Sequence, residues 1–326
     1  MIYNSLKEIA DNFDVFLFDA YGVFWAGNGF YAGSREMMAE LVKQGKFVAV
    51  ISNTSGIRED LITSYNKKGL IFGQDYCEFV AAGDLLKKTL AEGCLKFASN
   101  PKPRKYFVIG DPHSCAFNNT VYEQVEDIDK ADFVYCGVPH VYEDSLKKYP
   151  QLSDKFLPVK CDENGIINMW DTTDFTPFIE QVEMVAAKKL PALNANPDFV
   201  AKEGHPLSNT SAAEFVVRNG MIAEALRQRG CEVLEYGKPH LNIYEHTFAI
   251  LRNRGIKINK ERMCMIGDTI RTDIKGGINA GITPVLCVKT GVTAEEISKG
   301  NSIKNLCIKE NIEIQQIIQI KSVGEK

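Results

Sequence analysis

The feature of this sequence that most restricts its fold is a repeated alternation of short apolar runs with helical patterns. The run at 15–18 (VFLF) precedes a helical pattern at 34–45, and the run at 47–51 (FVAVI) precedes another at 57–68. Strands that are separated by helices normally pair in parallel, so this order predicts a parallel sheet with helices on its faces. We expect Ser34 to cap the first helix, because its hydroxyl can accept a hydrogen bond from the helix N-terminus.

The same order returns late in the chain, so both ends are expected to build one sheet. Strand-like runs stand at 231–237, 262–267 and 283–288, with helical patterns at 241–255 and from about 271 to Gly281. The pattern of the tail, which is apolar enough to pack, does not distinguish a strand from a helix.

The middle of the chain is predicted to be a second α/β unit that is inserted into the first. The elements expected there are strands at 105–110 and 132–137 and helices near 175–189 and 211–229. We therefore predict a doubly wound, Rossmann-like parallel-sheet core from residues 1–82 and 236–326, and an inserted α/β domain from residues 83–235.

Length and composition exclude several classes of protein. A chain of 326 residues favours two domains over one, and a net charge of -4 lacks the basic footprint of a nucleic-acid binder. The nine cysteines are an odd number without a CxxC pair, which argues against a disulfide framework or a structural zinc site. We find no signal-peptide pattern and no apolar run of about 20 residues, so we expect a cytoplasmic protein that does not bind membranes.

A polar residue follows each of four expected strands. These residues are Asp19, Ser52, Lys238 and Asp268. Taken singly, each has an ordinary explanation as a cap, a turn residue or a surface charge. In an open parallel sheet, however, the carboxyl ends of the strands line one crevice, so we expect the four side chains to converge there.

Two carboxylates, a hydroxyl and an ammonium group suit phosphoryl transfer. A carboxylate can attack phosphorus and form an acyl phosphate, while the ammonium and a divalent ion compensate the charge of the phosphate oxygens. Asp19 and Asp268 would make an all-oxygen site, which fits Mg²⁺ better than zinc. Asp273 lies five residues after Asp268, where it could complete the metal shell or orient Lys238.

In this order the motifs resemble those of the haloacid dehalogenase superfamily, which consists mostly of phosphatases. FLFDAYGV resembles the nucleophile motif, AVISNTSG the hydroxyl motif, EYGKPH the lysine motif and MIGDTIRTDIKGGINAGI the acidic metal motif. The insert, with LNANPDF at 193–199, resembles the large cap of the class IIA branch, which contains phosphoglycolate, pyridoxal-phosphate and nucleotide phosphatases. The resemblance extends from about residue 13 to about residue 297.

The resemblance implies a Mg²⁺ ion and its ligands. Asp19 would be both the nucleophile and a ligand, the main-chain carbonyl of Tyr21 a second ligand, and Asp268 a third. Asp273 would belong to the metal site or support it.

The resemblance also implies which residues bind the substrate. Ser52 and Lys238 would hold the phosphoryl group that is transferred. Asn53 and, from the cap, Asn196 and Asp198 would contact a small phosphate ester. Caps of this branch often pair subunits, which leaves a homodimer through the cap open.

Tyr21 departs from the phosphatase pattern, in which the nucleophile motif reads Asp-x-Asp and the second Asp is the general acid and base. A phenol with a pKa of about 10 is protonated at neutral pH and can donate its proton, but it is poorly suited to take one back. Losing a positioned acid–base group typically costs about 10²–10⁴ in rate.

Three functions remain open, in this order of preference. The first is a Mg²⁺-dependent phosphatase that is slow or specialised. The second is a 2-haloacid dehalogenase, in which Asp19 displaces halide and needs no leaving-group acid. The third is a catalytically weak relative that binds phosphate. The acidic motif favours the first, because a metal-free dehalogenase does not need it; another acid, or the substrate itself, could also replace the function of position 21.

Overall fold

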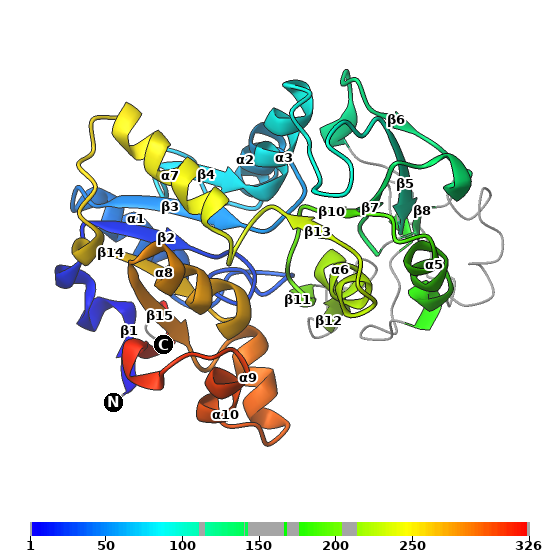
Figure 1. Cartoon of the computed structure of the whole chain (residues 1–326). Helices are drawn as coiled ribbons and strands as arrows, with labels where there is room; N and C mark the ends of the chain where they lie inside the picture. Colours follow the sequence, from blue (N-terminus) through cyan, green and yellow to red (C-terminus); the bar gives the residue numbers. More distant parts are fainter. Residues whose placement is uncertain are drawn as a thin grey trace.

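The structure is a computed structural model that describes residues 2–110, 115–139, 141–142, 166–167, 176–203 and 214–324. Its larger unit contains a seven-stranded sheet in the order β1-β16-β15-β14-β2-β3-β4, and all neighbouring strands are parallel (Figure 1). The strands are β1 (Ile2–Ser5), β2 (Val15–Phe18), β3 (Phe47–Ser52), β4 (Glu78–Ala81), β14 (Met263–Gly267), β15 (Thr283–Cys287) and β16 (Ile318–Ser322).

Helices cover both faces of this sheet because its central strands are apolar on both faces. Successive side chains of a strand point to opposite faces. In β2, Phe16 and Phe18 pack with residues of α1 (Ser34–Lys43), whereas Leu17 packs with residues of α7 (Leu241–Asn253). Strands that are buried on both faces read as unbroken apolar runs, which is the pattern of VFLF in the sequence. The other helices of this unit are α2 (Arg58–Lys67), α3 (Ala82–Ala91), α8 (Lys275–Ala280), α9 (Gly291–Ser298) and α10 (Ile303–Lys309).

The strand order reverses between β2 and β14, which are neighbours in the sheet. From β2 the chain winds through β3 to β4 in one direction, and β14, β15 and β16 extend in the other. Ligands of doubly wound sheets bind at such a switch point, beyond the carboxyl ends of the strands. The predicted doubly wound parallel sheet is thereby confirmed.

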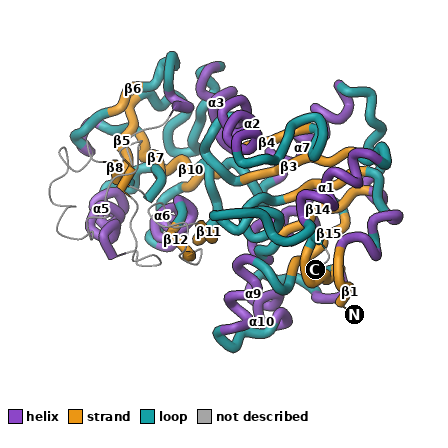
Figure 2. Tube along the Cα trace, turned by 180° about the vertical axis from the view of Figure 1, so that it is seen from behind, coloured by secondary structure: helices purple, strands orange, loops and turns teal. Residues whose placement is uncertain are grey.

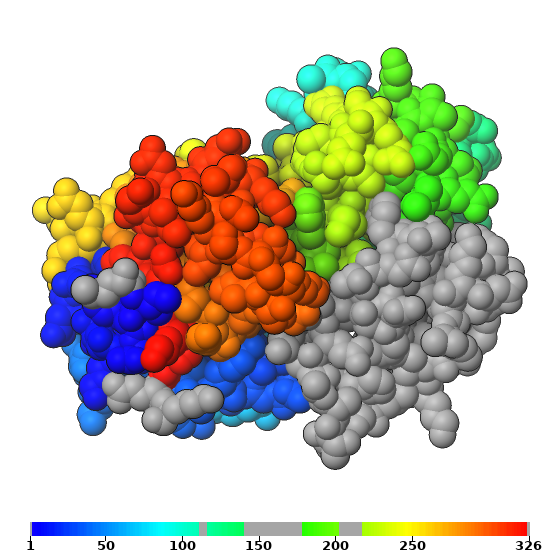
Figure 3. All heavy atoms as spheres, turned by 90° about the horizontal axis from the view of Figure 1, so that it is seen from below, coloured from blue at the N-terminus to red at the C-terminus, as the bar shows by residue number. Residues whose placement is uncertain are grey.

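The two ends of the chain form neighbouring strands at one edge of the sheet. β1 pairs in parallel with β16, with Ile2 opposite Gln319, and the termini lie close together from both sides (Figure 2). The space-filling view from below likewise shows atoms from both ends in contact (Figure 3). The tail, whose periodicity was ambiguous, contains both α10 and β16. Neither β1 nor β4 was predicted.

The inserted unit contains a second parallel sheet, of five strands in the order β13-β10-β7-β5-β6. It lies beside the larger unit (Figure 1), and two antiparallel pairs, β11 with β12 and β8 with β9, belong to the same part of the chain. Its elements are β5 (Lys105–Ile109), β6 (Glu123–Gln124), β7 (Phe133–Cys136), β8 (Val141–Tyr142), β9 (Ile166–Ile167), α5 (Thr176–Ala187), β10 (Ala192–Asn194), β11 (Val200–Glu203), β12 (Glu214–Val217), α6 (Asn219–Gln228) and β13 (Val233–Glu235).

The helix α3 joins the two units. Its Leu85 packs in a cluster with residues of the larger sheet, whereas Leu86 and Leu90 pack with Tyr106 and other residues of the inserted sheet. The expected boundary between residues 82 and 83 therefore falls at the start of a helix that packs on both units.

Two local predictions were wrong. The N-cap of α1 is Gly33, and the buried hydroxyl of Ser34 instead donates to the carbonyl oxygens of Tyr31 (2.7 Å) and Phe24 (3.1 Å). Within the range 211–229, which was predicted to be helical, β12 occupies 214–217 and α6 begins only at Asn219. The sequence EFVV of β12 is rich in residues that favour strands, and it pairs with β11. The part of that range before 214 lies outside the described residues.

Two expectations about the class of protein can be compared with the structure. Within the part of the chain that is described, no helix is long and apolar enough to cross a bilayer. The cysteines whose side chains are described are free thiols, and most of them are buried.

Glu235 anchors the chain where it returns from the inserted unit. Its carboxylate accepts a hydrogen bond from Asn194 Nδ2 (2.8 Å), lies 3.2 Å from His240 Nε2 and forms an ion pair with Arg227. Burial would raise the pKa of Glu235, but His240, Arg227 and Asn194 together outweigh burial and hold the pKa at about 2.

We expect Glu235→Gln to lower the free energy of unfolding by an amount that depends on pH. A carboxylate with a lowered pKa in the folded state stabilises the protein above its ordinary pKa, and this stabilisation is lost as the pH falls towards the folded value. The difference in unfolding free energy between wild type and variant should therefore shrink by about 3 kcal/mol between pH 5 and pH 2, as measured by urea unfolding. A difference that stays constant over this range would contradict the assignment.

Candidate active site

Three carboxylates meet beyond the carboxyl ends of β2 and β14. Asp19 follows β2 directly, Asp268 follows β14, and Asp273 lies in the helical turn Ile270–Ile274 that comes next. One oxygen atom from each carboxylate lies within 4.8 Å of the others. The strands are neighbours in the sheet, so the residues at their ends are brought together although about 250 residues separate them in the chain.

Lys238 completes this cluster with a buried ammonium group. Its side chain is 1% exposed, and Nζ lies 2.5 Å from Asp19 Oδ1 and 2.8 Å from Asp273 Oδ1. The side chain of Asn53 fixes the main chain of Lys238 on both sides: Oδ1 accepts the Lys238 N–H (2.6 Å), and Nδ2 donates to the Lys238 carbonyl (3.0 Å). The main chain that carries the ammonium is thereby tied to Asn53, the residue that directly follows β3.

Two glycines enclose the carboxylate of Asp268. The N–H of Val292 donates to Asp268 Oδ2 at 2.5 Å. Gly22 has a φ of +81°, and a Cβ atom there would lie 2.3 Å from Asp268 Oδ2; a Cβ atom at Gly291 would lie 1.9 Å from the same oxygen. Only glycine at both positions leaves room for the carboxylate in this place.

The donor set fits a hard divalent cation. Three carboxylates, the buried Asp268 and Asp273 and the partly buried Asp19, face one ammonium, so negative charge is in excess. Burial raises the pKa of Asp268 well above its usual range, and the charges of Asp273 and Asp19 raise it further. Carboxylate oxygens are the ligands that Mg²⁺ prefers, and a divalent ion between them would offset the excess charge.

Asp19 and Asp273 lie in different electrostatic and hydrogen-bonding surroundings. Burial raises the pKa of Asp19 to about 7; Lys238 acts in the opposite direction, while Asp273 and Asp198 add to the rise. Asp273 Oδ2 accepts the main-chain N–H groups of Asp268 and Thr269, both at 3.1 Å, and its Oδ1 faces Lys238. Of the two roles left open for Asp273, this geometry favours orienting Lys238.

A cavity of about 250 Å³ opens onto Asp19 between the two units. Its walls come from the sheet of the larger unit on one side and from the inserted unit on the other. The lining residues are Asp19, Tyr21, Ser52, Thr54 and Ser55 from the larger unit, and Val138, Asn196, Asp198, Ala201, Arg218 and Asn219 from the insert.

The loop after β10 brings Asn196 and Asp198 to this cavity. Asn196 Oδ1 accepts the N–H of Asp198 at 3.1 Å, and Asn53 Nδ2 donates to Asp198 Oδ1 at 3.0 Å, which links the two units. Asn53 itself, expected to contact substrate, is 1% exposed and is not among the lining residues. Its amide instead joins Lys238 to Asp198.

Ser52 and Tyr21 both line the cavity beside Asp19. Ser52 Oγ accepts the N–H of Thr54 at 3.4 Å. The ring of Tyr21 packs against the apolar core of the larger unit. Burial raises the pKa of the Tyr21 phenol, the positive charge of Arg218 opposes this rise, and Asp19 adds to it. The phenol is therefore protonated at neutral pH.

Sequence reasoning missed Arg218, which lines the cavity from the inserted unit. A signal was present, because Arg218 is a polar residue directly after the run EFVV that forms β12. Because one helix was predicted over 211–229, the end of this strand was not recognised.

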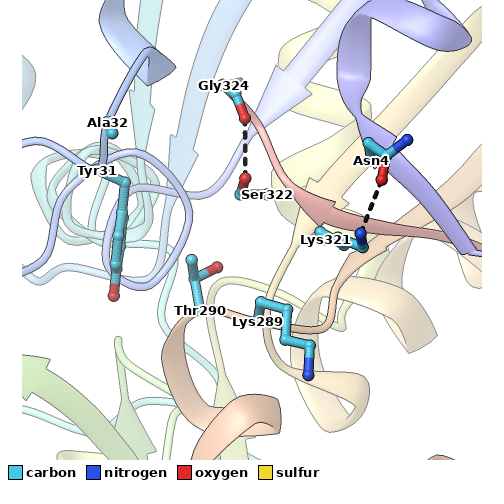
Figure 4. A pocket seen from close by; sticks show the side chains of 8 residues that line it. All are labelled: Asn4, Tyr31, Ala32, Lys289, Thr290, Lys321, Ser322 and Gly324. Carbon is cyan, nitrogen blue, oxygen red and sulfur yellow. Dashed lines mark hydrogen bonds between the residues drawn. The ribbon is translucent and has the colours of Figure 1, made fainter. Parts of the chain in front are cut away.

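A second and larger cavity, of about 770 Å³, lies beside the paired terminal strands (Figure 4). Lys321 Nζ donates to Asn4 Oδ1 (2.7 Å), and Ser322 Oγ donates to the carbonyl of Gly324 (2.9 Å). Among the described residues that line it there is no acid, so the described lining has no counterpart to the carboxylate cluster. The described residues that line it are Asn4, Tyr31, Ala32, Lys289, Thr290, Lys321, Ser322 and Gly324.

Models of two protein families match separate parts of the chain. A haloacid dehalogenase-like hydrolase model matches residues 16–121, and a HAD-hydrolase-like model matches residues 235–309. The two matched segments contain Asp19 and Ser52 in the first, and Lys238, Asp268 and Asp273 in the second. They leave out most of the inserted unit.

Curated relatives and a solved structure match nearly the whole chain. Phosphoglycolate phosphatase 2 of Arabidopsis thaliana is 26% identical over 92% of this chain and 91% of its own length. The 4-nitrophenylphosphatase of Schizosaccharomyces pombe is 25% identical over 89% of this chain and 88% of its own. A hydrolase of the haloacid dehalogenase-like family from Brucella suis 1330 shares the fold over the full length of both chains, with a TM-score of 0.70 and 21% identity.

Proposed function

Because the chain belongs to the haloacid dehalogenase-like hydrolases, of the branch with a large α/β cap, we propose that it is a Mg²⁺-dependent phosphatase of small phosphate monoesters. The observation that carries this proposal is the convergence of Asp19, Asp268, Asp273 and Lys238 at the switch point of the sheet. The names of the relatives, phosphoglycolate phosphatase and 4-nitrophenylphosphatase, support the same class of reaction.

In the first step, a carboxylate oxygen of Asp19 attacks phosphorus, and the bond between phosphorus and the ester oxygen breaks. The product is a phospho-aspartyl group on Asp19 and an alcohol that must receive a proton as it leaves. Lys238 neutralises charge on the phosphoryl oxygens, and the hydroxyl of Ser52 can donate a hydrogen bond to one of them.

In the second step, water attacks the same phosphorus atom, and inorganic phosphate leaves as the carboxylate of Asp19 is restored. Asp19, Asp268 and the main-chain carbonyl of Tyr21 would hold a Mg²⁺ ion, with Asp273 supporting the site, and the ion would compensate the charge of the phosphate. The inserted unit limits access of bulk water, since the cavity lies between the two units.

Both proton transfers of the reaction are inefficient in this enzyme, because Tyr21 stands where an acid–base group is needed. Its phenol can donate to the leaving oxygen, but a group with a pKa raised above 10 is a poor base for the attacking water. We therefore propose that the enzyme is slow with alkyl esters and works best on leaving groups that need little protonation.

The dehalogenase alternative has less support, because halide displacement by Asp19 needs neither the acidic cluster nor a divalent ion. A screen of phosphate monoesters and 2-haloacids, each with and without Mg²⁺, tests the proposal. We expect Mg²⁺-stimulated release of phosphate, with p-nitrophenyl phosphate among the fastest substrates. Release of halide without metal would instead establish the dehalogenase, and phosphate binding without turnover would establish the phosphate-binding relative.

Removal and return of Mg²⁺ should change stability as well as activity. After treatment with a chelator, added Mg²⁺ is expected to raise Tm by several degrees, because a ligand at about 100 times its Kd contributes about 2.7 kcal/mol. In Asp268→Asn, where the amide oxygen can still accept the Val292 N–H, the shift should disappear. The exposed Asp60→Asn is the matched control and should keep the full shift. An equal shift in Asp268→Asn would show that the ion binds elsewhere.

A further inference from the structure

We propose that the larger cavity, beside the paired terminal strands, is a second binding site for a small organic phosphate that carries a flat ring. The site is separate from the candidate active site, and the inference does not depend on the phosphatase function proposed above. The observations behind it are two lysines and a buried hydroxyl group without a hydrogen bond in the lining of one cavity (Figure 4).

Two lysines supply positive charge to this cavity. Lys321 belongs to β16 and Lys289 follows the neighbouring strand β15, and the main-chain N–H of Lys289 donates to the carbonyl of Lys321 at 3.0 Å. Lys321 Nζ donates to the uncharged side chain of Asn4, and within the described part of the chain neither lysine forms an ion pair. Since the described lining holds no acid to offset these charges, an anionic ligand is favoured here.

The hydroxyl group of Thr290 is buried in the lining without a hydrogen bond. Thr290 is 7% exposed and occupies the N-cap position of α9, where a threonine side chain normally accepts a main-chain N–H of the first helical turn. Here Asp268 accepts these bonds instead: its carboxylate accepts the N–H of Val292 (2.5 Å), and its carbonyl accepts the N–H of Thr293 (3.1 Å). Thr290 Oγ1 therefore makes no hydrogen bond with a described residue.

The neighbouring thiol of Cys287 does not replace the missing partner of Thr290. Burial raises the pKa of Cys287 well above its usual range, against the effect of the Thr290 hydroxyl, so the thiol is neutral. A neutral thiol is only a weak hydrogen-bond acceptor. Buried polar groups are nearly always hydrogen-bonded, so a ligand in the cavity is the natural partner for this hydroxyl.

A phosphate group matches the donors of this lining. It carries close to two negative charges at neutral pH and has three oxygen atoms that accept hydrogen bonds, whereas a single carboxylate carries one charge. The ammonium groups of Lys289 and Lys321 and the hydroxyl of Thr290 are donors that line the same cavity. We therefore assign the anionic end of the ligand to a phosphate.

The cavity also has an aromatic wall and enough room for a ring. Tyr31, which is partly exposed, stands on the other side of the cavity from Lys321 (Figure 4). Nucleobases and similar flat rings stack on aromatic side chains with little dependence on the identity of the base. The volume of about 770 Å³ lies within the range of 300–1,000 Å³ that is usual for small-molecule sites.

The site is distinct from the candidate active site, although one short segment lies between them. The described linings of the two cavities have no residue in common. Thr290 lines the larger cavity, while two residues later the N–H of Val292 bonds to the carboxylate of Asp268. Binding at one site can therefore be measured separately from binding at the other.

Calorimetry of the full chain in buffer without divalent ions tests the inference. Under this condition no metal ion offsets the three carboxylates of the candidate active site, which then disfavour a phosphate, so binding reports on the larger cavity. We expect 5′-AMP to bind with a Kd below about 1 mM, and adenosine, which has the ring without the phosphate, to bind at least about 10-fold more weakly. Ribose 5-phosphate and inorganic phosphate, which lack the ring, should also bind more weakly than 5′-AMP.

Variants of the lining assign this binding to the cavity. Lys289→Met/Lys321→Met keeps the apolar stems of two exposed side chains, so it should fold, and it should bind 5′-AMP at least about 10-fold more weakly than the wild type. Thr290→Val removes only the unpaired hydroxyl and should weaken binding about 2- to 10-fold. The exposed Lys43→Met, in α1, is the control and should keep the full affinity.

Each outcome decides for or against the inference. Absence of 5′-AMP binding to the wild type would overturn it, and equal affinities for 5′-AMP and adenosine would exclude recognition of the phosphate. Equal affinities for 5′-AMP and inorganic phosphate would exclude a contribution of the ring. Undiminished binding in the double lysine variant would show that the ligand binds elsewhere. None of these measurements depends on catalysis, so a failure of the phosphatase proposal would leave them unchanged.

Discussion

Asp19→Asn is expected to abolish phosphate release from every ester while leaving the fold intact. The amide of asparagine is not a nucleophile towards phosphorus, so the phospho-aspartyl group cannot form. The substitution preserves the shape of the side chain, and its amide oxygen can still accept a hydrogen bond from Lys238 in place of Asp19 Oδ1. Steady-state assays should show a loss of at least 10³-fold, and circular dichroism should show unchanged secondary structure.

The matched control is Asp60→Asn, which makes the same chemical change on the exposed surface of α2. It should retain the activity of the wild type. Incubation with a labelled phosphate ester, followed by acid quenching, should leave label on the wild-type protein and none on Asp19→Asn. Retained activity in Asp19→Asn would exclude Asp19 as the nucleophile.

Tyr21→Asp is expected to raise kcat for alkyl phosphate esters by at least 10-fold. A carboxyl group at this position, on the wall of the cavity beside Asp19, can both protonate the leaving oxygen and take a proton from the attacking water. A positioned acid–base group typically raises the rate about 10²–10⁴-fold. The loss of the packed Tyr21 ring should offset a part of this gain in kcat. For p-nitrophenyl phosphate, whose leaving group needs little protonation, the gain should be much smaller.

Two further substitutions at the same position make this test specific. Tyr21→Asn has the shape of aspartate without its acid, so it should give no gain. Tyr21→Phe removes only the hydroxyl, and a further fall in kcat for alkyl esters would identify the phenol as the present proton donor. If Tyr21→Asp and Tyr21→Asn have equal kcat, position 21 is not where the missing acid–base group belongs.

Most of the fold and the centre of the candidate site could be predicted from local sequence patterns. A strand such as VFLF is short, apolar on both faces and ended by a charged residue, and each of these properties is encoded in consecutive residues. Once the strands are known to be parallel, their carboxyl ends must share one edge. Asp19, Ser52 and Asp268 could therefore be placed together without knowledge of any loop.

Other parts depended on contacts between residues far apart in the chain. β1 was not predicted, because a four-residue segment forms a strand there only through pairing with β16 at the other end of the chain. The segment at 214–217 was assigned to a helix, because its pairing with β11 is not visible in its own periodicity. A substrate contact was expected for Asn53, but its amide instead bonds to Lys238 of the larger unit and, through the docking of the inserted unit, to Asp198.

By itself, the sequence determined the type of sheet and the groups that stand at its strand ends, since both follow from backbone geometry over a few residues. Only the tertiary structure decided the opposite wall of the cavity, where Arg218 and Asp198 face the strand ends of the larger unit. That wall arises from the packing of one domain on another, which depends on long-range contacts that no short stretch of sequence encodes.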